Sequence, residues 1–575
     1  MKKLVGYLRK YRKECVLGPL FKLLEACLEL IVPLVMAKII DTGVVNNAGS
    51  GYIWRMGALL AGMGLAGLAF SITAQYFAAK AACGFGAELR HALFERTQRL
   101  SRSQIKTMGA PTLIQRMTGD VNQVQSGLNL ALRLLLRSPF VVMGAMIMAF
   151  VVDARCALIF LAVIPALAAV VAGIMAITMP MHKQARKRLD GVLSATRENL
   201  TGARVIRAFN LQTQEIQSFR QKNDALTSLS RLSGRISALM NPLTYVLVNL
   251  ALVALLRTGA VRVDVGGITQ GELVALVNYL SQILVELVKL ADLIVSISRA
   301  LACAERIQSV LSVEPDLLDP VQVPNASADD CAVRFDHVSM RYPGAAADTL
   351  TDISFAVGKG EMMGIIGGTG AGKSTLVELI PRFYDVTGGE VSVLGRDVRA
   401  WNRAELRKHI GNVPQKARLF SGTIRENLCY GRENATEAEL RAALEAAQAL
   451  DVVASKAEGL DAPVAQGGAN FSGGQRQRLT IARALVGRPD ILILDDSASA
   501  LDFATEARLR QAIRQLDFHP TTFVVSQRIS SVRNADVIAV LDDGHLVGLG
   551  TNDALMESCQ VYREICASQE GGEAK

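Results

Sequence analysis

The sequence predicts a multi-domain membrane protein in which an all-α domain of six transmembrane helices precedes an α/β domain with a phosphate-binding loop. Half of the 575 residues are hydrophobic and the mean hydropathy is +0.27, which is unusual for a soluble chain of this length. The apolar residues cluster before Ser298, and a glycine-rich loop follows at residues 367–375. We therefore expect a transmembrane domain at 1–315, a proline-containing linker at 316–328 and the α/β domain at 329–575.

Six apolar stretches of the first domain are long enough to cross a hydrocarbon core of ~30 Å. They lie at Val16–Ile40, Ile53–Ala82, Leu134–Val152, Cys156–Met179, Ile236–Leu256 and Gly271–Ser298. The connections between the second and third stretches and between the fourth and fifth are rich in Arg and Lys, whereas the other connections contain at most two such residues. Because cytoplasmic loops carry the excess of positive residues, we expect both termini in the cytoplasm. The basic segment Met1–Lys13 suits a helix on the inner membrane surface.

Several ionisable residues fall inside the predicted spans. Glu25 and Glu29 lie four apart on one face of the first span, and Glu286, Lys289 and Asp292 lie three apart on the sixth. Ionisable groups within a membrane are costly and usually face a cavity. Glu286 lies ~22 Å along its helix, near mid-membrane. We hypothesise that Glu286, paired with Lys289, lines a translocation path; an intrahelical ion pair is the alternative.

A phosphate-binding loop opens the second domain. Residues 367–375 fit the pattern G-x-x-x-x-G-K-[ST], with an apolar strand-like run before the loop and a helix-like run after it. The glycines let backbone amides face phosphates, Lys373 reaches the β- and γ-phosphates, and Ser374 can hold Mg²⁺. The nucleotide-binding residues expected in this loop are Gly367, Gly370, Gly372, Lys373, Ser374 and Thr375.

Further motifs follow the loop in a fixed order. Gln415 stands in Val-Pro-Gln, Ser472–Gln475 reads Ser-Gly-Gly-Gln, an apolar run ends in Asp495 and Asp496, and Asp502 closes Ser-Ala-Leu-Asp. A phosphate loop followed by these motifs resembles the ATPase domain of ABC transporters, and the resemblance covers about residues 331–566.

The resemblance implies roles for several residues, with ATP and Mg²⁺ as cofactors. Tyr342 would stack on adenine, and Ser374, Gln415 and Asp495 would serve Mg²⁺, Asp495 through water. Asp502 would belong to the loop named for that aspartate in the family. The signature residues that would cap the γ-phosphate of ATP held by a second subunit are Ser472, Gly473, Gly474 and Gln475. Without the resemblance, Tyr342 reads as a partly buried strand tyrosine and the signature as a helix-capping turn.

Two catalytic positions depart from the family pattern. Asp496 stands where the family has the Glu that polarises the attacking water, and it is one methylene shorter. Gln527 stands where the family usually has His; Gln can donate a hydrogen bond but cannot become cationic near neutral pH. Both changes beside an intact loop and signature resemble the degenerate-site subunit of heterodimeric bacterial multidrug-type ABC exporters. A homodimer that works adequately with Asp and Gln is the alternative.

The long cytoplasmic connections favour export. They contain few Pro or Gly residues, so we expect them to extend the spans as helices. At their tips, Gly109–Asp120 and Glu198–Phe209 resemble the two coupling helices of ABC exporters. The resemblance implies a multi-pass half-transporter of a bacterial cytoplasmic (inner) membrane that pairs with a different half-transporter and moves a small molecule, lipid or peptide. An ATP-gated channel or regulator is an alternative from another class.

Composition bears on metal sites, disulfides and nucleic-acid partners. The nine cysteines have no paired metal-ligand spacing, which suits a reducing compartment without a disulfide framework. The net charge of +9 is explained by the basic cytoplasmic connections, so we expect no nucleic-acid partner.

Overall fold

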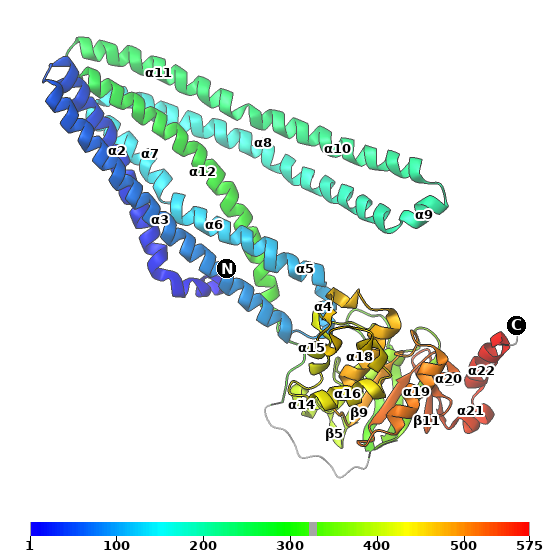
Figure 1. The fold of residues 1–575 in the computed structure, drawn as a ribbon. Coiled ribbons are helices and arrows are strands. Elements are labelled where there is room, and N and C mark those ends of the chain that lie inside the picture. The colour runs from blue at the N-terminus through cyan, green and yellow to red at the C-terminus, as the bar shows by residue number, and fades with distance from the viewer. Residues whose placement is uncertain (1, 321–330, 574–575) are drawn as a thin grey trace. The chain divides into compact units, whose positions relative to one another are not determined.

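The computed structural model describes residues 2–320 and 331–573, which form two compact units (Figure 1). The first unit contains Met1–Gln98 and Pro111–Val313, and the second contains Arg99–Ala110 and Glu314–Lys575. A short segment of the N-terminal half therefore packs with the C-terminal unit. The units are a helical domain and an α/β domain, in the order that the sequence predicts.

The first unit is built from long helices. Its elements are α1 (Lys2–Val5), η1 (Gly6–Tyr11), α2 (Arg12–Lys38), η2 (Ile39–Val45), α3 (Ser50–Arg99), α5 (Ala110–Gln115), η3 (Arg116–Asp120), α6 (Val121–Leu134), α7 (Arg137–Val152), α8 (Ala154–Thr201), α9 (Ala203–Ala208), α10 (Gln212–Ala238), α11 (Met240–Asp264) and α12 (Gln270–Leu311). Among the described residues, four helical stretches are long and apolar enough to cross a membrane: Ser50–Arg99, Ala110–Val152, Ala154–Thr201 and Gln212–Asp264. The predicted spans within α2 and α12 are not among these four, so the number of six remains a prediction.

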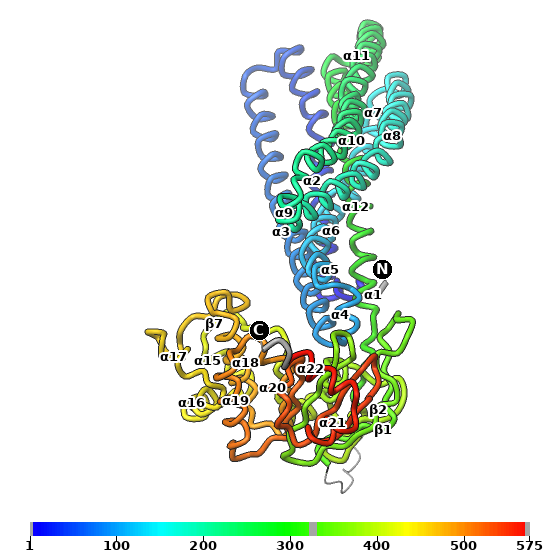
Figure 2. The backbone as a smooth tube through the Cα atoms, turned by 90° about the vertical axis from the view of Figure 1, so that its right-hand side faces the viewer, coloured from blue at the N-terminus to red at the C-terminus, as the bar shows by residue number. Residues whose placement is uncertain are grey.

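Helix α12 is the centre of the first unit. It packs against α2, α6, α7, α8 and α11, and its fully buried Tyr279 donates a hydrogen bond from its hydroxyl to the Leu30 carbonyl of α2 at 2.7 Å. Small residues such as Ala26 and Ala145 are fully buried at these contacts, which lets the helix backbones approach closely. Helix α8 runs beside α10 and α11 in both views (Figures 1 and 2).

The second unit contains a mostly parallel six-stranded sheet in the order β12-β11-β3-β10-β9-β6, in which only β12 is antiparallel to its neighbour. The strands β3, β9 and β10 are buried along their whole length, as expected for central strands that are covered on both faces. A second sheet in the order β2-β1-β4-β5 is antiparallel, and β7 pairs with β8. One hydrophobic core lies on each side of the main sheet.

The strands of the second unit are β1 (Cys331–Met340), β2 (Leu350–Gly358), β3 (Met362–Gly367), β4 (Gly388–Val393), β5 (Arg396–Asp397), β6 (Ile410–Val413), β7 (Gly422–Thr423), β8 (Pro463–Val464), β9 (Ile491–Asp495), β10 (Thr521–Val525), β11 (Val537–Asp542) and β12 (His545–Gly550). Its helices are α4 (Arg102–Met108), α13 (Lys373–Leu379), η4 (Val398–Ala400), α14 (Arg403–Leu406), α15 (Ile424–Cys429), α16 (Glu437–Ala446), α17 (Leu450–Ala454), η5 (Gly459–Asp461), η6 (Gln466–Gly468), α18 (Gly473–Val486), α19 (Phe503–Arg514), α20 (Ile529–Val532), α21 (Asn552–Ser558) and α22 (Gln560–Glu573).

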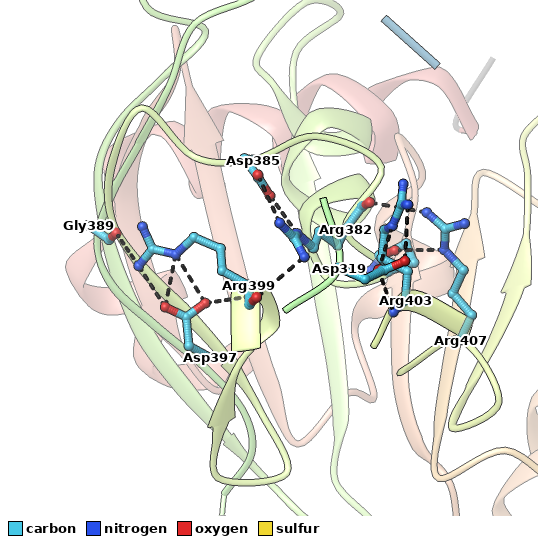
Figure 3. Close-up of polar contacts among 9 residues, drawn as sticks. Asp319, Arg382, Asp385, Gly389, Asp397, Arg399, Arg403 and Arg407 are labelled. Atoms are coloured by element: carbon cyan, nitrogen blue, oxygen red, sulfur yellow. Dashed lines mark hydrogen bonds and ion pairs between the residues drawn. The ribbon is translucent and has the colours of Figure 1, made fainter. Parts of the chain in front are cut away.

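The described part of the predicted linker is packed against the second unit. Leu317 is buried, and the Asp319 carboxylate accepts hydrogen bonds from the Arg403 guanidinium at 2.8 and 3.2 Å (Figure 3). This contact lowers the pKa of Asp319. In the same view, Arg407 donates to the backbone carbonyls of Pro381 and Arg382 at 3.1 and 3.2 Å. Residues 314–320 thus form part of the α/β unit; residues 321–328 of the predicted linker lie outside the described residues.

Candidate nucleotide site

Four loops converge at one edge of the main sheet. The parallel strands β3, β6, β9 and β10 end next to one another at this edge. The loops after β6, β9 and β10 carry Gln415, Asp496 and Gln527, and Lys373 begins α13 after the loop that follows β3. In open α/β sheets, ligands bind outside the carboxyl ends of the strands. The topology therefore places motifs that are up to 160 residues apart in sequence around one site.

The phosphate loop requires glycine at its two ends. Gly367 has φ 155° and Gly372 has φ 92°. A Cβ atom at Gly367 would lie 2.1 Å from the Leu541 carbonyl oxygen, and one at Gly372 would lie 2.7 Å from the Leu350 side chain. Because neither the backbone angle nor the space admits a side chain, the loop can turn tightly against β11 and β2 only with glycine.

A cavity of 260 Å³ lies between these loops. The expected site residues that line it are Gly370, Gly372, Lys373, Ser374, Thr375, Gln415, Asp495, Asp496 and Gln527. Thr349, Thr369, Val525 and Ser526 also line it. Sequence reasoning missed them because Thr369 is an unspecified position of the loop pattern and the other three lie outside the motifs. Gly367 and Tyr342 are not among the lining residues: Gly367 begins the loop, and Tyr342 stands beside Thr375.

Lys373 holds the loop in shape. Its side chain is buried, and its ammonium donates to the carbonyl oxygens of Gly367 at 2.8 Å and Gly368 at 2.6 Å. Burial lowers the pKa of Lys373, and the carboxylates of Asp496 and Asp495 oppose that shift. The ammonium therefore sits in the loop with negative carboxylates nearby, a position from which it can reach a bound phosphate.

Ser374 and Asp495 can together supply a Mg²⁺ site. The Ser374 hydroxyl donates to Asp495 Oδ1 at 2.9 Å, and the Asp495 carboxylate lies at the end of β9 with the residue only 8% exposed. Burial raises the pKa of Asp495, and the neighbouring charge of Asp496 raises it further. Among the residues that the structure describes, no group of three or more His, Cys, Asp or Glu could hold a metal by itself. Mg²⁺ is usually bound by one or two carboxylates, and phosphate oxygens of the substrate complete its coordination shell.

We expect Asp495→Asn to raise the melting temperature of the nucleotide-free protein by a few degrees at neutral pH. Because the pKa of Asp495 is raised in the folded state, its carboxylate destabilises the fold progressively as pH rises above the ordinary carboxyl pKa, and fully above the raised pKa. Below the ordinary carboxyl range, wild type and variant should melt alike. Thermal unfolding at acid and neutral pH checks this, and the variant should lose the extra stabilisation by MgATP. The exposed Asp517→Asn is the control, with no rise expected. A variant less stable than wild type at neutral pH would contradict this account.

Asp496 and Gln527 both line the cavity that the intact phosphate loop also lines. Asp496 has φ 45°, a left-handed conformation that Asp tolerates better than most non-glycine residues. Its carboxylate accepts a hydrogen bond from Gln415 Nε2 at 3.2 Å. Gln527 is exposed, and its backbone carbonyl accepts from Gln569 Nε2 at 2.7 Å. The cavity of the phosphate loop thus contains a short carboxylate and a neutral amide among its lining groups.

Tyr342 borders the loop, and a helix from the N-terminal half lies against it. The Tyr342 hydroxyl lies 3.0 Å from Thr375 Oγ1, its ring meets Tyr384 edge-on, and Lys106 Nζ of α4 lies 5.5 Å from the ring centroid. Arg102 of α4 pairs with Glu378 of α13 at 2.5 Å. Sequence reasoning missed Arg102 and Lys106, because only the tertiary structure brings α4 to the α/β unit.

The predicted coupling segments have helical structure. Gly109–Asp120 contains α5 and the π-helix η3, where the buried Asp120 pairs with Arg306 at 2.6 Å, and Glu198–Phe209 contains α9. The segment of the first half that packs with the α/β unit begins before Gly109, at Arg99–Ala110.

The signature forms a separate site. Ser472 caps α18: its hydroxyl accepts a hydrogen bond from the backbone N–H of Gln475 at 3.3 Å, and its own backbone N–H donates to Gln475 Oε1 at 2.9 Å. Ser472, Gly473, Gly474, Gln475 and Asp502 line a second cavity of 1010 Å³. The two cavities share no lining residue. Within one chain, the signature therefore faces a different space from the phosphate loop.

Comparison with known proteins identifies the family. The profile of the ABC transporter transmembrane region matches residues 15–287, and the ABC transporter profile matches residues 350–499. An uncharacterised ABC transporter ATP-binding protein of Mycobacterium tuberculosis is 38% identical over 98% of this chain and 97% of that protein. An ATP-dependent lipid A-core flippase of Syntrophus aciditrophicus is 32% identical over 83% of this chain and 79% of that protein.

The fold also matches a solved structure. A bacterial Atm1-family ABC exporter with ATP bound has a TM-score of 0.81 over 97% of this chain and 98% of that chain, at 24% sequence identity. The matched 97% of this chain includes residues of both units. With its fused transmembrane and ATP-hydrolysing domains and its exporter-type fold, the chain belongs to the ABC transporters.

Proposed function

We propose that this chain is one subunit of a heterodimeric ABC exporter and supplies a degenerate ATP site. The observation that carries the proposal is that Asp496 and Gln527 line one cavity with an otherwise complete set of Lys373, Ser374 and Asp495. Lys373 and the loop would bind ATP, and Ser374, Gln415 and Asp495 would hold Mg²⁺. The changed pair would leave the attacking water poorly positioned, and a shift of about 1 Å can cost on the order of a hundredfold in rate.

The signature gives the chain its second role. Its cavity lies apart from the phosphate loop, which supports a site that is completed by another subunit. A serine hydroxyl and helix-start amides suit a γ-phosphate. In this arrangement Ser472–Gln475 completes the hydrolysing site of the partner, while ATP at the degenerate site stays bound and holds the two ATPase domains together.

The transported molecule is proposed to be an amphiphile that leaves the cytoplasm across a bacterial inner membrane, with both termini of this chain on the cytoplasmic side. The flippase relative acts on a lipid, which supports a lipid-like or amphipathic substrate. The apolar surfaces of the long helices, where Leu65 and Ile72 of α3 are 68% and 61% exposed, suit contact with lipid.

The asymmetry of the two sites is testable by matched substitutions. We expect Asp496→Gln in this chain to change transport by the complex by no more than about twofold, whereas the same change of the catalytic Glu in the partner lowers it on the order of a hundredfold or more. Transport into inside-out vesicles with the co-purified partner measures both. Equal losses from the two substitutions would refute the asymmetry, and full activity without any partner would establish the homodimer.

A further inference from the structure

A cavity of 420 Å³ lies between α2 and α12 in the helical unit. This volume falls in the range of ligand pockets, about 300–1,000 Å³. Its wall is apolar at Val32, Pro33, Met36 and Val285. Polar side chains also reach it from α12, including Gln282, so the cavity offers both an apolar surface and groups that can orient a ligand.

A buried arginine joins two of the carboxylates that line this cavity, Glu29 and Glu286. Arg137 of α7 has a side chain only 7% exposed, and it donates to Glu286 Oε1 at 2.6 Å and to Glu29 Oε2 at 2.5 Å. Glu286 also accepts from Ser138 at 2.7 Å and from Lys289 at 2.8 Å. Both oxygens of Glu286 are therefore already bonded, and its side chain is 3% exposed. It acts as an anchor for Arg137 and Lys289 rather than as a free ligand group.

The accessible charges are one of each sign. The Glu29 side chain is 38% exposed and the Lys289 side chain is 44% exposed, and both line the cavity. Each keeps one partner in the charge cluster but presents remaining hydrogen-bonding capacity to the cavity. A ligand with only a positive group would be attracted by Glu29 but repelled by Lys289, and one with only a negative group would be attracted by Lys289 but repelled by Glu29. Like-charge contacts therefore disfavour singly charged ligands, whereas a ligand that carries both charges can pair each of them with its opposite.

Gln282 contributes an acceptor atom that lacks a hydrogen bond. Its side-chain oxygen is buried and has no hydrogen-bond partner among the described residues, and Gln282 lines the cavity beside the two charges. A buried acceptor without a donor costs free energy, so such groups are satisfied by water or by a ligand. That oxygen has almost no accessible surface, so the more exposed carboxylate of Glu29 is the acceptor that a ligand N–H can reach from the cavity.

We propose that this cavity binds a zwitterionic amphiphile. Its ammonium group donates to Glu29, its phosphate or carboxylate accepts from Lys289, and its hydrocarbon chain lies on the wall formed by Val32, Pro33 and Met36. The inference rests on the proposed export function and names the substrate class of that function. The same chemistry occurs in zwitterionic phospholipids and in acylated amino acids.

Binding to the full-length chain in phosphatidylglycerol nanodiscs, measured by native mass spectrometry without ATP, tests the proposal. The probes are lysophosphatidylethanolamine, Nε-dodecanoyl-lysine, dodecylamine and dodecyl phosphate. We expect at least one of the two zwitterions to bind on the order of tenfold or more tightly than both singly charged probes. Binding of both zwitterions identifies the charge pair alone as the determinant; binding of only one identifies its source as phospholipid or amino acid. Equal binding of all four overturns the proposal.

Single substitutions assign the two charges. Glu29→Gln should reduce binding of the zwitterion on the order of tenfold to a hundredfold, to the level of dodecyl phosphate, and Lys289→Gln should reduce it to the level of dodecylamine. Lys289→Gln leaves Glu286 bonded to Arg137 and Ser138, so it should fold even if Glu29→Gln does not. Asp292→Asn, on the same helix but outside the cavity lining, is the matched control and should bind like wild type. Unchanged binding in Lys289→Gln would also overturn the proposal.

Transport separates this inference from the proposed function. If the zwitterions bind with this pattern but MgATP moves no amphiphile across vesicles that contain the complex, the export function fails and the binding site stands. If MgATP drives transport of other amphiphiles and the nanodisc experiment shows no preference for zwitterions, the export function stands and the binding inference fails.

Discussion

The Asp496→Glu, Gln527→His double variant is expected to hydrolyse ATP on the order of a hundredfold faster than the wild-type chain when each is reconstituted alone in lipid. The wild-type chain should show almost no turnover. The reason is geometric: both residues line the cavity of an intact phosphate loop, so a longer carboxylate and an imidazole would complete a site whose other parts are already placed. Phosphate release at saturating MgATP measures the effect.

Two controls separate catalysis from folding and contamination. Adding Lys373→Ala to the double variant should abolish the gain, because the loop loses the ammonium that reaches the phosphates. The second control is the melting temperature of the double variant. It is needed because position 496 has φ 45°, a backbone conformation that costs a residue other than Gly, Asn or Asp about 1–2 kcal/mol. Brisk turnover by the wild-type chain would show a self-sufficient homodimer and contradict the degenerate site.

Gly473→Asp is expected to lower ATP turnover by the complex of this chain and its partner about a thousandfold. A carboxylate at the start of α18 would face the γ-phosphate of the partner's ATP, and two unit charges ~4 Å apart repel by about 4 kcal/mol at an effective dielectric of 20. A Cβ atom at Gly473 would have only an ordinary contact, 3.9 Å from Ala500 Cβ. An acidic residue in the first turn of a helix also favours folding. The variant should therefore lose activity without losing stability.

Gly473→Asn is the matched control because Asn has nearly the same size and no charge. It should retain far more turnover than Gly473→Asp, and the melting temperatures of both variants should remain near that of wild type. Gly474 is less suitable for this test, since a Cβ there would lie 3.0 Å from the Ala500 carbonyl oxygen. Equal losses in the Asp and Asn variants would indicate a steric effect, and undiminished turnover in Gly473→Asp would show that the signature does not act on ATP.

Local sequence was sufficient for the elements whose geometry is set by neighbouring residues. The loop at 367–375 could be predicted because its backbone angles and close contacts admit glycine but no side chain at Gly367 and Gly372. The strand β3 and the helix α13 flank it as expected. The signature could be placed at a helix start because Ser472 and Gln475 cap each other three residues apart. Apolar stretches likewise predicted a helical transmembrane domain, although α2 and α12 carry charges within the predicted spans.

The sequence by itself determined the two domains, the family and the residues of the phosphate loop, since these depend on composition, short spacings and local backbone preference. Only the tertiary structure decided that Arg137 joins Glu29 and Glu286, that Lys106 lies against Tyr342, and that the signature and the phosphate loop face different cavities. Arg137 and Glu286 are 149 positions apart. Helical periodicity states which face of each helix a residue occupies, but the choice of the facing helix and the register between them depend on how all the helices pack together.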